Sequence, residues 1–221
     1  MPQGALRAMN PPRVLLLDLD GTLADSLGVV RRVYEEFVLD HGGTPSQAEF
    51  ESLNGPPLAE VLRRLKAIHG LPGSERELLA RYEALLDRIY LEVAPNPGAG
   101  ELLARARHAG CLTGVVTSNS AARTRAWLER SGLAPAIDAL VASDDVRVGK
   151  PDPEPYLLAL QRCNCAAVAG VAVEDSGQGA RAAMAAGLRT FLLASAHAPA
   201  AAPEGVERVA GLAMVAERLW S

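Results

Sequence analysis

VLLLDLDGT, residues 14–22, is the stretch of sequence that decides the fold. Its first four residues form an unbroken apolar run, which is typical of a strand buried on both faces of a parallel sheet. The run ends at Asp18 and Asp20, whose side chains point to the same side of an extended chain because they are two residues apart. Gly21 then permits a sharp turn, and Thr22 can cap the next element of the chain. Open α/β sheets bind ligands at the carboxyl ends of their strands, so both acids are well placed for chemistry.

The pair of acids has a catalytic and a purely structural interpretation. Two close carboxylates repel each other unless one is protonated or a cation lies between them. With a divalent metal, one can attack as a nucleophile while the other carries a proton. Taken alone, Asp20-Gly21 is also compatible with an ordinary turn. A calcium-binding loop needs further acids at regular spacing and a closing Glu, and the next residues, Thr22, Leu23 and Ala24, do not fit that pattern.

Length and composition indicate one substantial core. The chain has 221 residues, of which 49% are hydrophobic and 4% aromatic, so the core must consist mostly of Leu, Ala and Val. The net charge of −4 gives no bulk attraction to nucleic acid or to acidic membranes. No window of about 18 residues is uninterruptedly apolar, so we expect no membrane-spanning helix.

Cysteine usage and the first residues favour a cytoplasmic protein. Cys111, Cys163 and Cys165 are odd in number and lack the spacing of a zinc site, so we expect reduced thiols. Residues 1–12 lack the charged segment and long apolar core of a signal peptide. We expect a monomer or a homodimer with no nucleic-acid or membrane partner.

Residues 25–94 are predicted to form an all-helical insertion after the first strand. Apolar residues recur there at three- and four-residue steps, in stripes that begin near Val29, Leu58 and Leu78, and no convincing strand interrupts them. A further helix is expected to begin near Ser46. The remaining residues, 1–24 and 95–221, then form a Rossmann-like catalytic core, with the helices of 25–94 as a cap domain.

Strand and helix patterns alternate after the insertion. Alternation of this kind predicts an α/β fold with a doubly wound parallel sheet. The expected strands are 14–17, 112–117, 140–142, 168–173 and 190–193, and the expected helices are 100–108, 121–131, 153–162, 177–186 and 206–219.

Polar residues come directly after the second of these strands. Thr117, Ser118 and Asn119 supply a hydroxyl and then backbone amides at the start of a helix, an arrangement that suits a phosphate oxygen. An equally simple alternative is that Ser118 or Asn119 only caps that helix.

Two further junctions carry charged residues. Lys150, one of only two lysines, stands between Gly149 and a proline just before a helix, where it can neutralise a phosphate and a carboxylate together. The alternative is an ordinary surface lysine. Glu174 and Asp175 end another apolar strand and offer the hard oxygen ligands that suit Mg²⁺, although Asp175 and Ser176 can also form a helix cap.

These four motifs, in this order, resemble those of the haloacid dehalogenase (HAD) superfamily over about residues 13–194. Asp-x-Asp-Gly-Thr stands at 18–22, the second-motif hydroxyl at Thr117, the third-motif lysine at Lys150 in Gly-Lys-Pro-Asp-Pro, and the fourth motif at Glu174-Asp175. The helical insertion resembles the cap of the phosphoglycolate phosphatase and β-phosphoglucomutase subgroup.

The resemblance implies a role for each motif. Asp18 would be the nucleophile that forms an aspartyl-phosphate, and Asp20 the general acid and then base. The phosphoryl group would be held by Thr117 and Lys150. Further substrate contacts are expected from Ser118, Asn119 and Gly55, and the metal ligands from Asp18, Asp20 (through its backbone carbonyl), Glu174 and Asp175.

The expected activity is that of a Mg²⁺-dependent phosphatase acting on a small phosphorylated metabolite such as phosphoglycolate, pyrophosphate or a sugar phosphate. Dehalogenase chemistry is disfavoured, because the family's dehalogenases need neither Mg²⁺ nor an acid two residues after the nucleophile. One alternative is a phosphomutase. The loop 54–60 lacks the arginine with which mutase relatives grip a second phosphate, but Arg63 or Arg64 could replace it. A non-enzymatic phosphometabolite-binding protein is the third possibility.

Overall fold

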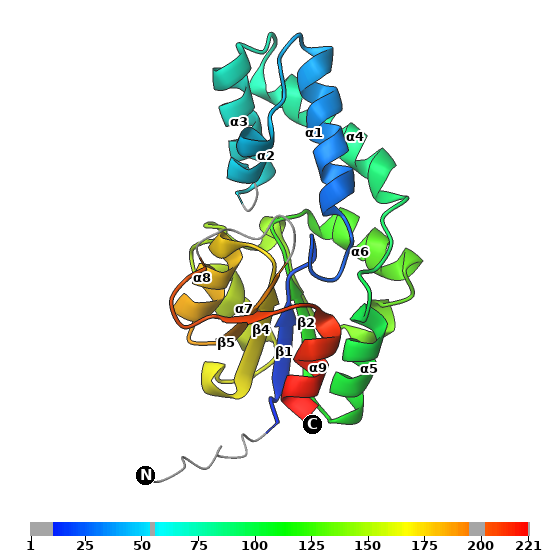
Figure 1. Ribbon diagram of the computed structural model, residues 1–221, viewed down its shortest axis with the longest axis vertical. Helices are drawn as coiled ribbons and strands as arrows, with labels where there is room; N and C mark the ends of the chain where they lie inside the picture. The colour runs from blue at the N-terminus through cyan, green and yellow to red at the C-terminus, as the bar shows by residue number, and fades with distance from the viewer. Residues whose placement is uncertain (1–10, 54–55, 195–201, 221) are drawn as a thin grey trace.

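A parallel sheet of six strands forms the centre of the computed structural model (Figure 1). The structure describes residues 11–53, 56–194 and 202–220. The strands are β1 (Val14–Leu17), β2 (Leu112–Val116), β3 (Ala139–Val141), β4 (Gly170–Glu174), β5 (Arg189–Leu193) and β6 (Glu207–Val209), in the order β3-β2-β1-β4-β5-β6. In the register, Leu17 of β1 lies between Val115 of β2 and Val173 of β4, so the carboxyl ends of these three strands lie side by side.

Helices cover both faces of the sheet, which explains why its central strands are apolar without interruption. Leu15 and Leu17 pack into a cluster with α5 (Ala99–His108), α6 (Ala121–Arg130) and α9 (Leu212–Trp220). Val14 and Leu16 point the other way, toward α7 (Glu154–Arg162) and α8 (Gly177–Ala185). The predicted α/β fold with a doubly wound parallel sheet is therefore confirmed.

In the described part of the segment between β1 and α5, four helices stand beyond the carboxyl edge of the sheet (Figure 1). They are α1 (Leu27–Asp40), α2 (Gln47–Ser52), α3 (Leu58–His69) and α4 (Glu75–Tyr90). Ser46 caps α2, and Ser74 with Glu77 forms a capping box at the start of α4. The apolar stripes of these helices meet in a hydrophobic cluster of their own, which includes Phe37 and Leu65.

The two segments that connect the helical insertion to the sheet run side by side. Ala24 and Pro95 form an antiparallel bridge, and the backbone N–H of Asp25 donates to the carbonyl of Ala94 at 2.9 Å. The side-chain amide of Asn96 donates to the carbonyls of residues 21 and 22 at 3.0 and 2.8 Å. The return of the insertion therefore braces the turn that follows Asp20.

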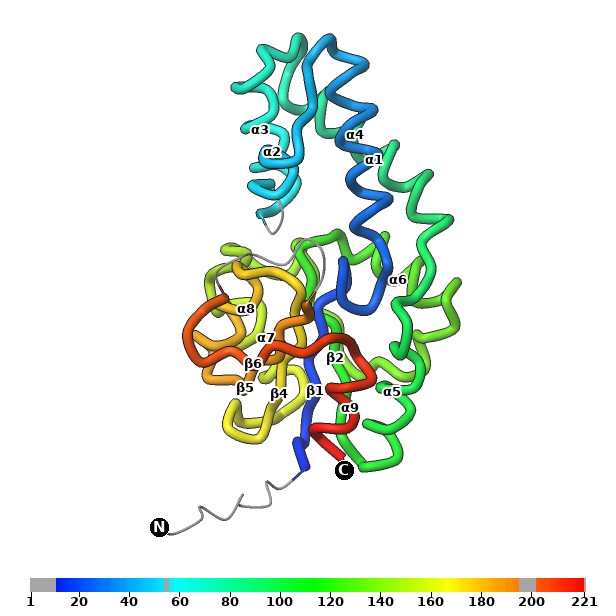
Figure 2. The backbone as a smooth tube through the Cα atoms, in the orientation of Figure 1, coloured from blue at the N-terminus to red at the C-terminus, as the bar shows by residue number. Residues whose placement is uncertain are grey.

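The carboxyl-terminal part differs from the sequence prediction. The apolar pattern predicts a helix over 206–219, whereas the structure forms β6 first and begins α9 only at Leu212. β6 pairs with β5, and Arg189 contacts Glu207 across them at 2.6 Å. This strand forms by pairing with a strand from another part of the chain, so its own three residues carry no pattern that predicts it. β4 also begins at Gly170 rather than at residue 168, after a short 3₁₀ turn. Figure 2 marks β5 and β6 at this edge of the sheet.

All three cysteines are free, as predicted. Across residues 11–53, 56–194 and 202–220, none of the helices combines the length and the apolar composition that crossing a membrane requires.

Candidate active site

The ends of three neighbouring strands open into one cavity of about 360 Å³. Asp18 follows β1, Thr117 follows β2 and Asp175 follows β4, and all three line it. The helical insertion covers the cavity from the opposite side, with residues from α1 to α4 in the lining. The site therefore lies between the sheet and the insertion.

Lys150 lies inside the site and not on the surface. Its ammonium group donates to Asp18 Oδ1 at 2.6 Å, to Glu174 Oε1 at 2.6 Å and to the carbonyl of Val116 at 2.8 Å. Its loop is fixed because the carboxylate of Glu154 accepts from two backbone N–H groups, those of residues 147 and 148. Burial alone would lower the pKa of Lys150, but the two carboxylates raise it above its ordinary value.

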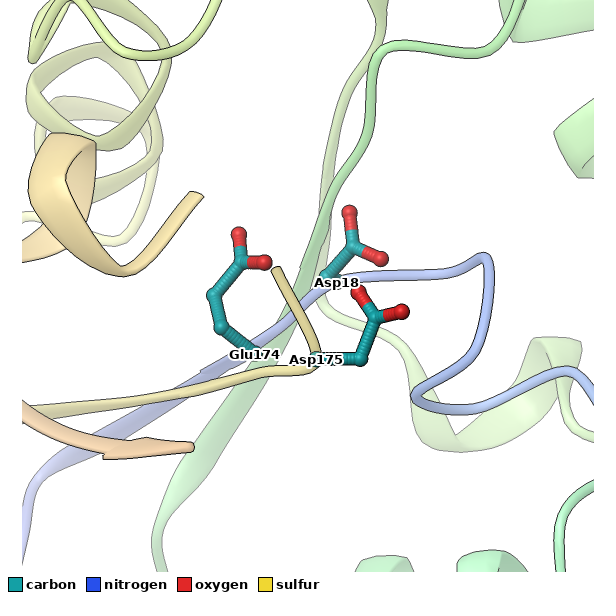
Figure 3. Close-up of side chains that lie close together, drawn as sticks. All are labelled: Asp18, Glu174 and Asp175. Carbon is teal, nitrogen blue, oxygen red and sulfur yellow. The ribbon is translucent and has the colours of Figure 1, made fainter. Parts of the chain in front are cut away.

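Three buried carboxylates surround this lysine. Asp18, Glu174 and Asp175 have oxygens within 4.8 Å of one another and extend into a common space from the ends of β1 and β4 (Figure 3). Burial raises the pKa of Asp18 to about 8 although Lys150 lowers it, and burial also raises the pKa of Asp175 well above its ordinary value. One ammonium group does not balance three carboxylates.

The same cluster fits a divalent cation. Asp175 Oδ2 is buried and has no hydrogen-bond partner within the described part of the chain. An unpaired buried carboxylate oxygen is costly, and carboxylate oxygens are the ligands that Mg²⁺ prefers. The donor set of Asp18, Glu174 and Asp175 therefore fits the predicted metal.

The side chain of Asp20, by contrast, lies outside that cluster. It accepts hydrogen bonds from the hydroxyls of Ser26, at 2.6 Å, and of Tyr90. The side-chain amide of Asn119 also donates to it, at 3.2 Å. Asp20 is thus oriented by groups from both ends of the insertion and from the loop after β2.

The loop after β2, for which the sequence predicts phosphate binding, faces the cavity. Thr117 is buried, and its hydroxyl accepts from the backbone N–H of Asn119 at 3.0 Å. The helix cap of α6 is Ser120 and neither Ser118 nor Asn119, so the capping alternative does not account for those two residues. Both line the cavity. Gly55, the remaining predicted contact, lies outside the described residues.

Several residues of the site were not predicted. Tyr156 donates a hydrogen bond to Glu174, Tyr90 contacts Asp20, and Arg123 donates to Asn119 Oδ1 at 2.7 Å. Tyr90 belongs to an apolar stripe whose pattern predicts a core-facing side chain, which is correct for its ring but not for its hydroxyl. Of the residues that contact Asp20, only Ser26 lies close enough to the first motif for the sequence to point to it.

The crowding around Asp175 makes Gly21 hard to replace. Gly21 has φ = +78°, and a Cβ there would lie 2.2 Å from Asp175 Oδ2. We expect Gly21→Ala to lower the free energy of unfolding by at least about 2 kcal/mol, measured by urea denaturation. Gly28→Ala is the matched control, since Gly28 is exposed in α1 and a Cβ there meets no atom within 4 Å. It should leave stability unchanged or raise it by up to about 1 kcal/mol. Equal stabilities of the two variants would contradict this geometry.

Comparisons with known proteins point to one family. A family model described as haloacid dehalogenase-like hydrolase matches residues 15–193. Hexitol phosphatase A of Escherichia coli is 34% identical over 192 residues, which cover 85% of this chain and 84% of that protein. Pyrophosphatase PpaX of Bacillus velezensis is 32% identical over 182 residues and 80% of each chain. Among solved structures, CbbY from Rhodobacter sphaeroides in complex with xylulose-(1,5)bisphosphate superposes with a TM-score of 0.82 at 25% identity, over 91% of this chain and 95% of the other.

Proposed function

The chain belongs to the haloacid dehalogenase-like hydrolases and is a phosphatase of that family, and from this premise we propose that it hydrolyses a small phosphorylated metabolite with Mg²⁺ through an aspartyl-phosphate. One observation carries the proposal: the Lys150 ammonium contacts Asp18 and Glu174 at 2.6 Å each, beside the unpaired oxygen of Asp175. Phosphoryl transfer depends chiefly on positioning and on neutralising charge, which this arrangement supplies.

In the first step, a carboxylate oxygen of Asp18 attacks phosphorus and the bond from phosphorus to the leaving oxygen breaks. Asp20 gives its proton to that oxygen, so the leaving group departs neutral. In the second step, Asp20 takes a proton from water as the water oxygen attacks the phosphoryl group. The bond to Asp18 breaks, and phosphate leaves. Thr117, Ser118, Asn119 and Lys150 hold the phosphoryl oxygens throughout.

Mg²⁺ would be held by Asp18, Glu174 and Asp175, together with the backbone carbonyl of Asp20. When bound, the metal neutralises the repulsion between an anionic nucleophile and an anionic phosphate. Residues 25–94 would act as the cap domain that closes the cavity. The three free thiols are compatible with a cytoplasmic location. A mutase is not favoured: Arg63 and Arg64 both pair with Glu60, and neither is in the described lining of the cavity.

Phosphate release from a panel that includes a hexitol phosphate, pyrophosphate and phosphoglycolate tests this function. We expect release in Mg²⁺, loss of release in EDTA and recovery when Mg²⁺ is restored. Mg²⁺ should also raise the melting temperature of the wild type, because it binds the folded state, but not that of Asp175→Asn. Asp40→Asn, at an exposed position of α1, should keep the wild-type response. Release that persists in EDTA would refute the metal dependence.

A further inference from the structure

The cavity has two chemically different ends. Polar side chains of the sheet domain, among them Asp18, Thr117 and Lys150, form one end. At the other end the insertion contributes mainly apolar side chains, which include Val30, Phe50, Leu53, Leu58, Leu79 and Leu86. The phosphoryl group belongs at the polar end, beside Asp18, so the rest of the substrate extends toward the apolar end.

The apolar end is unsuited to a second anionic group. The described residues that the insertion contributes to the lining include no lysine, arginine or histidine, and the one charged residue among them is an acid, Glu83. Arg123 enters the lining from α6, but its guanidinium is bound to Asp87 Oδ1 and Asn119 Oδ1, each at 2.7 Å. A distal phosphate or carboxylate would therefore meet apolar carbon and a like charge.

Among the described residues that the insertion contributes to the lining, few have polar side chains that could bind several hydroxyls: three tyrosines and Glu83. The hydroxyl of Tyr34 donates to Glu49 Oε1 at 2.6 Å and accepts from the backbone N–H of Ser46 at 2.8 Å. The hydroxyl of Tyr90 is used by Asp20 and Asn119. A polyol placed here would lose bonds to water without replacing most of them, and a buried hydroxyl without a partner is costly.

We infer that the alcohol released from the substrate is uncharged and largely apolar, so that the substrate is an alkyl or aryl phosphate monoester. This inference rests on the proposed phosphatase function and narrows it. It disfavours bisphosphates, phosphorylated carboxylic acids and polyol phosphates. A hydrocarbon chain of the substrate that packs against these walls displaces water from both apolar surfaces. Each methylene group buried in this way raises the affinity about fourfold. A cavity of about 360 Å³ suits a leaving group of a few carbons.

Binding of non-hydrolysable analogues tests the inference independently of turnover. Methylphosphonate and hexylphosphonate differ by five methylene groups, and calorimetric titration of the wild type with Mg²⁺ gives an affinity for each. We expect hexylphosphonate to bind at least about thirtyfold more tightly, with a more negative heat-capacity change. Affinities that agree within about threefold would overturn the inference.

Kinetics supply the second measurement. The ratio of kcat/KM for hexyl phosphate to that for a hexitol phosphate should exceed about tenfold, and kcat/KM should rise along the series of methyl, butyl and hexyl phosphates. A flat series, or faster hydrolysis of the hexitol phosphate or of phosphoglycolate, would overturn the inference while leaving the phosphatase intact. Absence of metal-dependent phosphate release from every compound would instead refute the proposed function.

A pair of variants on one helix locates the effect. Leu58→Asn places an amide in the apolar end of the cavity and should reduce the preference for hexylphosphonate over methylphosphonate by at least about fivefold. Ile68→Asn makes the same kind of change at a side chain of α3 that is 58% exposed and outside the lining, and should leave the preference unchanged. An equal preference in the two variants would overturn the assignment of this end to the leaving group.

Discussion

Asp18→Asn is expected to reduce phosphate release by at least about a thousandfold, because an amide cannot form the phosphoryl ester that the proposed reaction requires. The measurement is steady-state phosphate release in Mg²⁺ with the best substrate of the panel. Asp25→Asn is the control, since Asp25 is an exposed acid seven residues further along the chain. It should keep activity within about twofold.

Stability separates this chemical effect from a folding defect. The pKa of Asp18 is raised to about 8 in the folded protein by burial. A carboxyl whose folded pKa lies above its unfolded value costs stability as pH rises between the two, here from about pH 4 to about pH 8. Asparagine removes that cost. The melting temperature of Asp18→Asn at pH 8 in EDTA should therefore be no lower than that of the wild type. If Asp18→Asn released phosphate at nearly the wild-type rate, Asp18 would be excluded as the nucleophile.

Lys150→Met should lower both stability and activity. The side chain of Lys150 is 3% exposed and bridges Asp18 and Glu174, so its removal leaves buried carboxylates facing one another without a cation. Removing one partner of a buried ion pair costs about 3–5 kcal/mol. We expect the free energy of unfolding of Lys150→Met, measured in EDTA, to fall by this amount. Activity should be lost as well, since the variant has no ammonium group to neutralise the phosphoryl oxygens.

Lys66→Met supplies the comparison, because Lys66 is the other lysine of the chain and makes its hydrogen bonds to backbone carbonyls near the surface. We expect a loss of about 1–2 kcal/mol and unchanged catalysis. If the two lysine variants were equally stable, the ion-pair network around Lys150 would not hold the site together.

Much of the fold could be predicted because its signals are local. Strands buried on both faces are continuous apolar runs, as in residues 14–17, and helices that cover a core carry apolar stripes at three- and four-residue steps. β6 was missed for the opposite reason. Residues 207–209 form a strand because they pair with the edge of β5. A segment of three residues is too short to show a periodic pattern that would predict this pairing.

In the candidate site, too, the residues with a local sequence signal were predicted and those without one were missed. Asp18, Lys150 and Asp175 stand at junctions between elements, where the order of strands brings them together. Tyr90 and Tyr156 were missed because each lies within a helix whose pattern describes only its apolar side. Their hydroxyls reach Asp20 and Glu174 through tertiary packing, over 70 and 18 residues of sequence.

The bridge between Ala24 and Pro95 has a consequence for how such proteins diversify. Because the entrance and the exit of the insertion are hydrogen-bonded neighbours, both chain connections between the insertion and the sheet domain pass through one place. A shorter, longer or differently lined helical module could be grafted there without moving any strand. On the proposed function, exchange of the insertion between relatives at these two positions would replace the surface that chooses the alcohol and would leave Asp18, Lys150 and Asp175 in place. The exchanged insertion would have to retain hydroxyl groups at the positions of Ser26 and Tyr90, which orient Asp20.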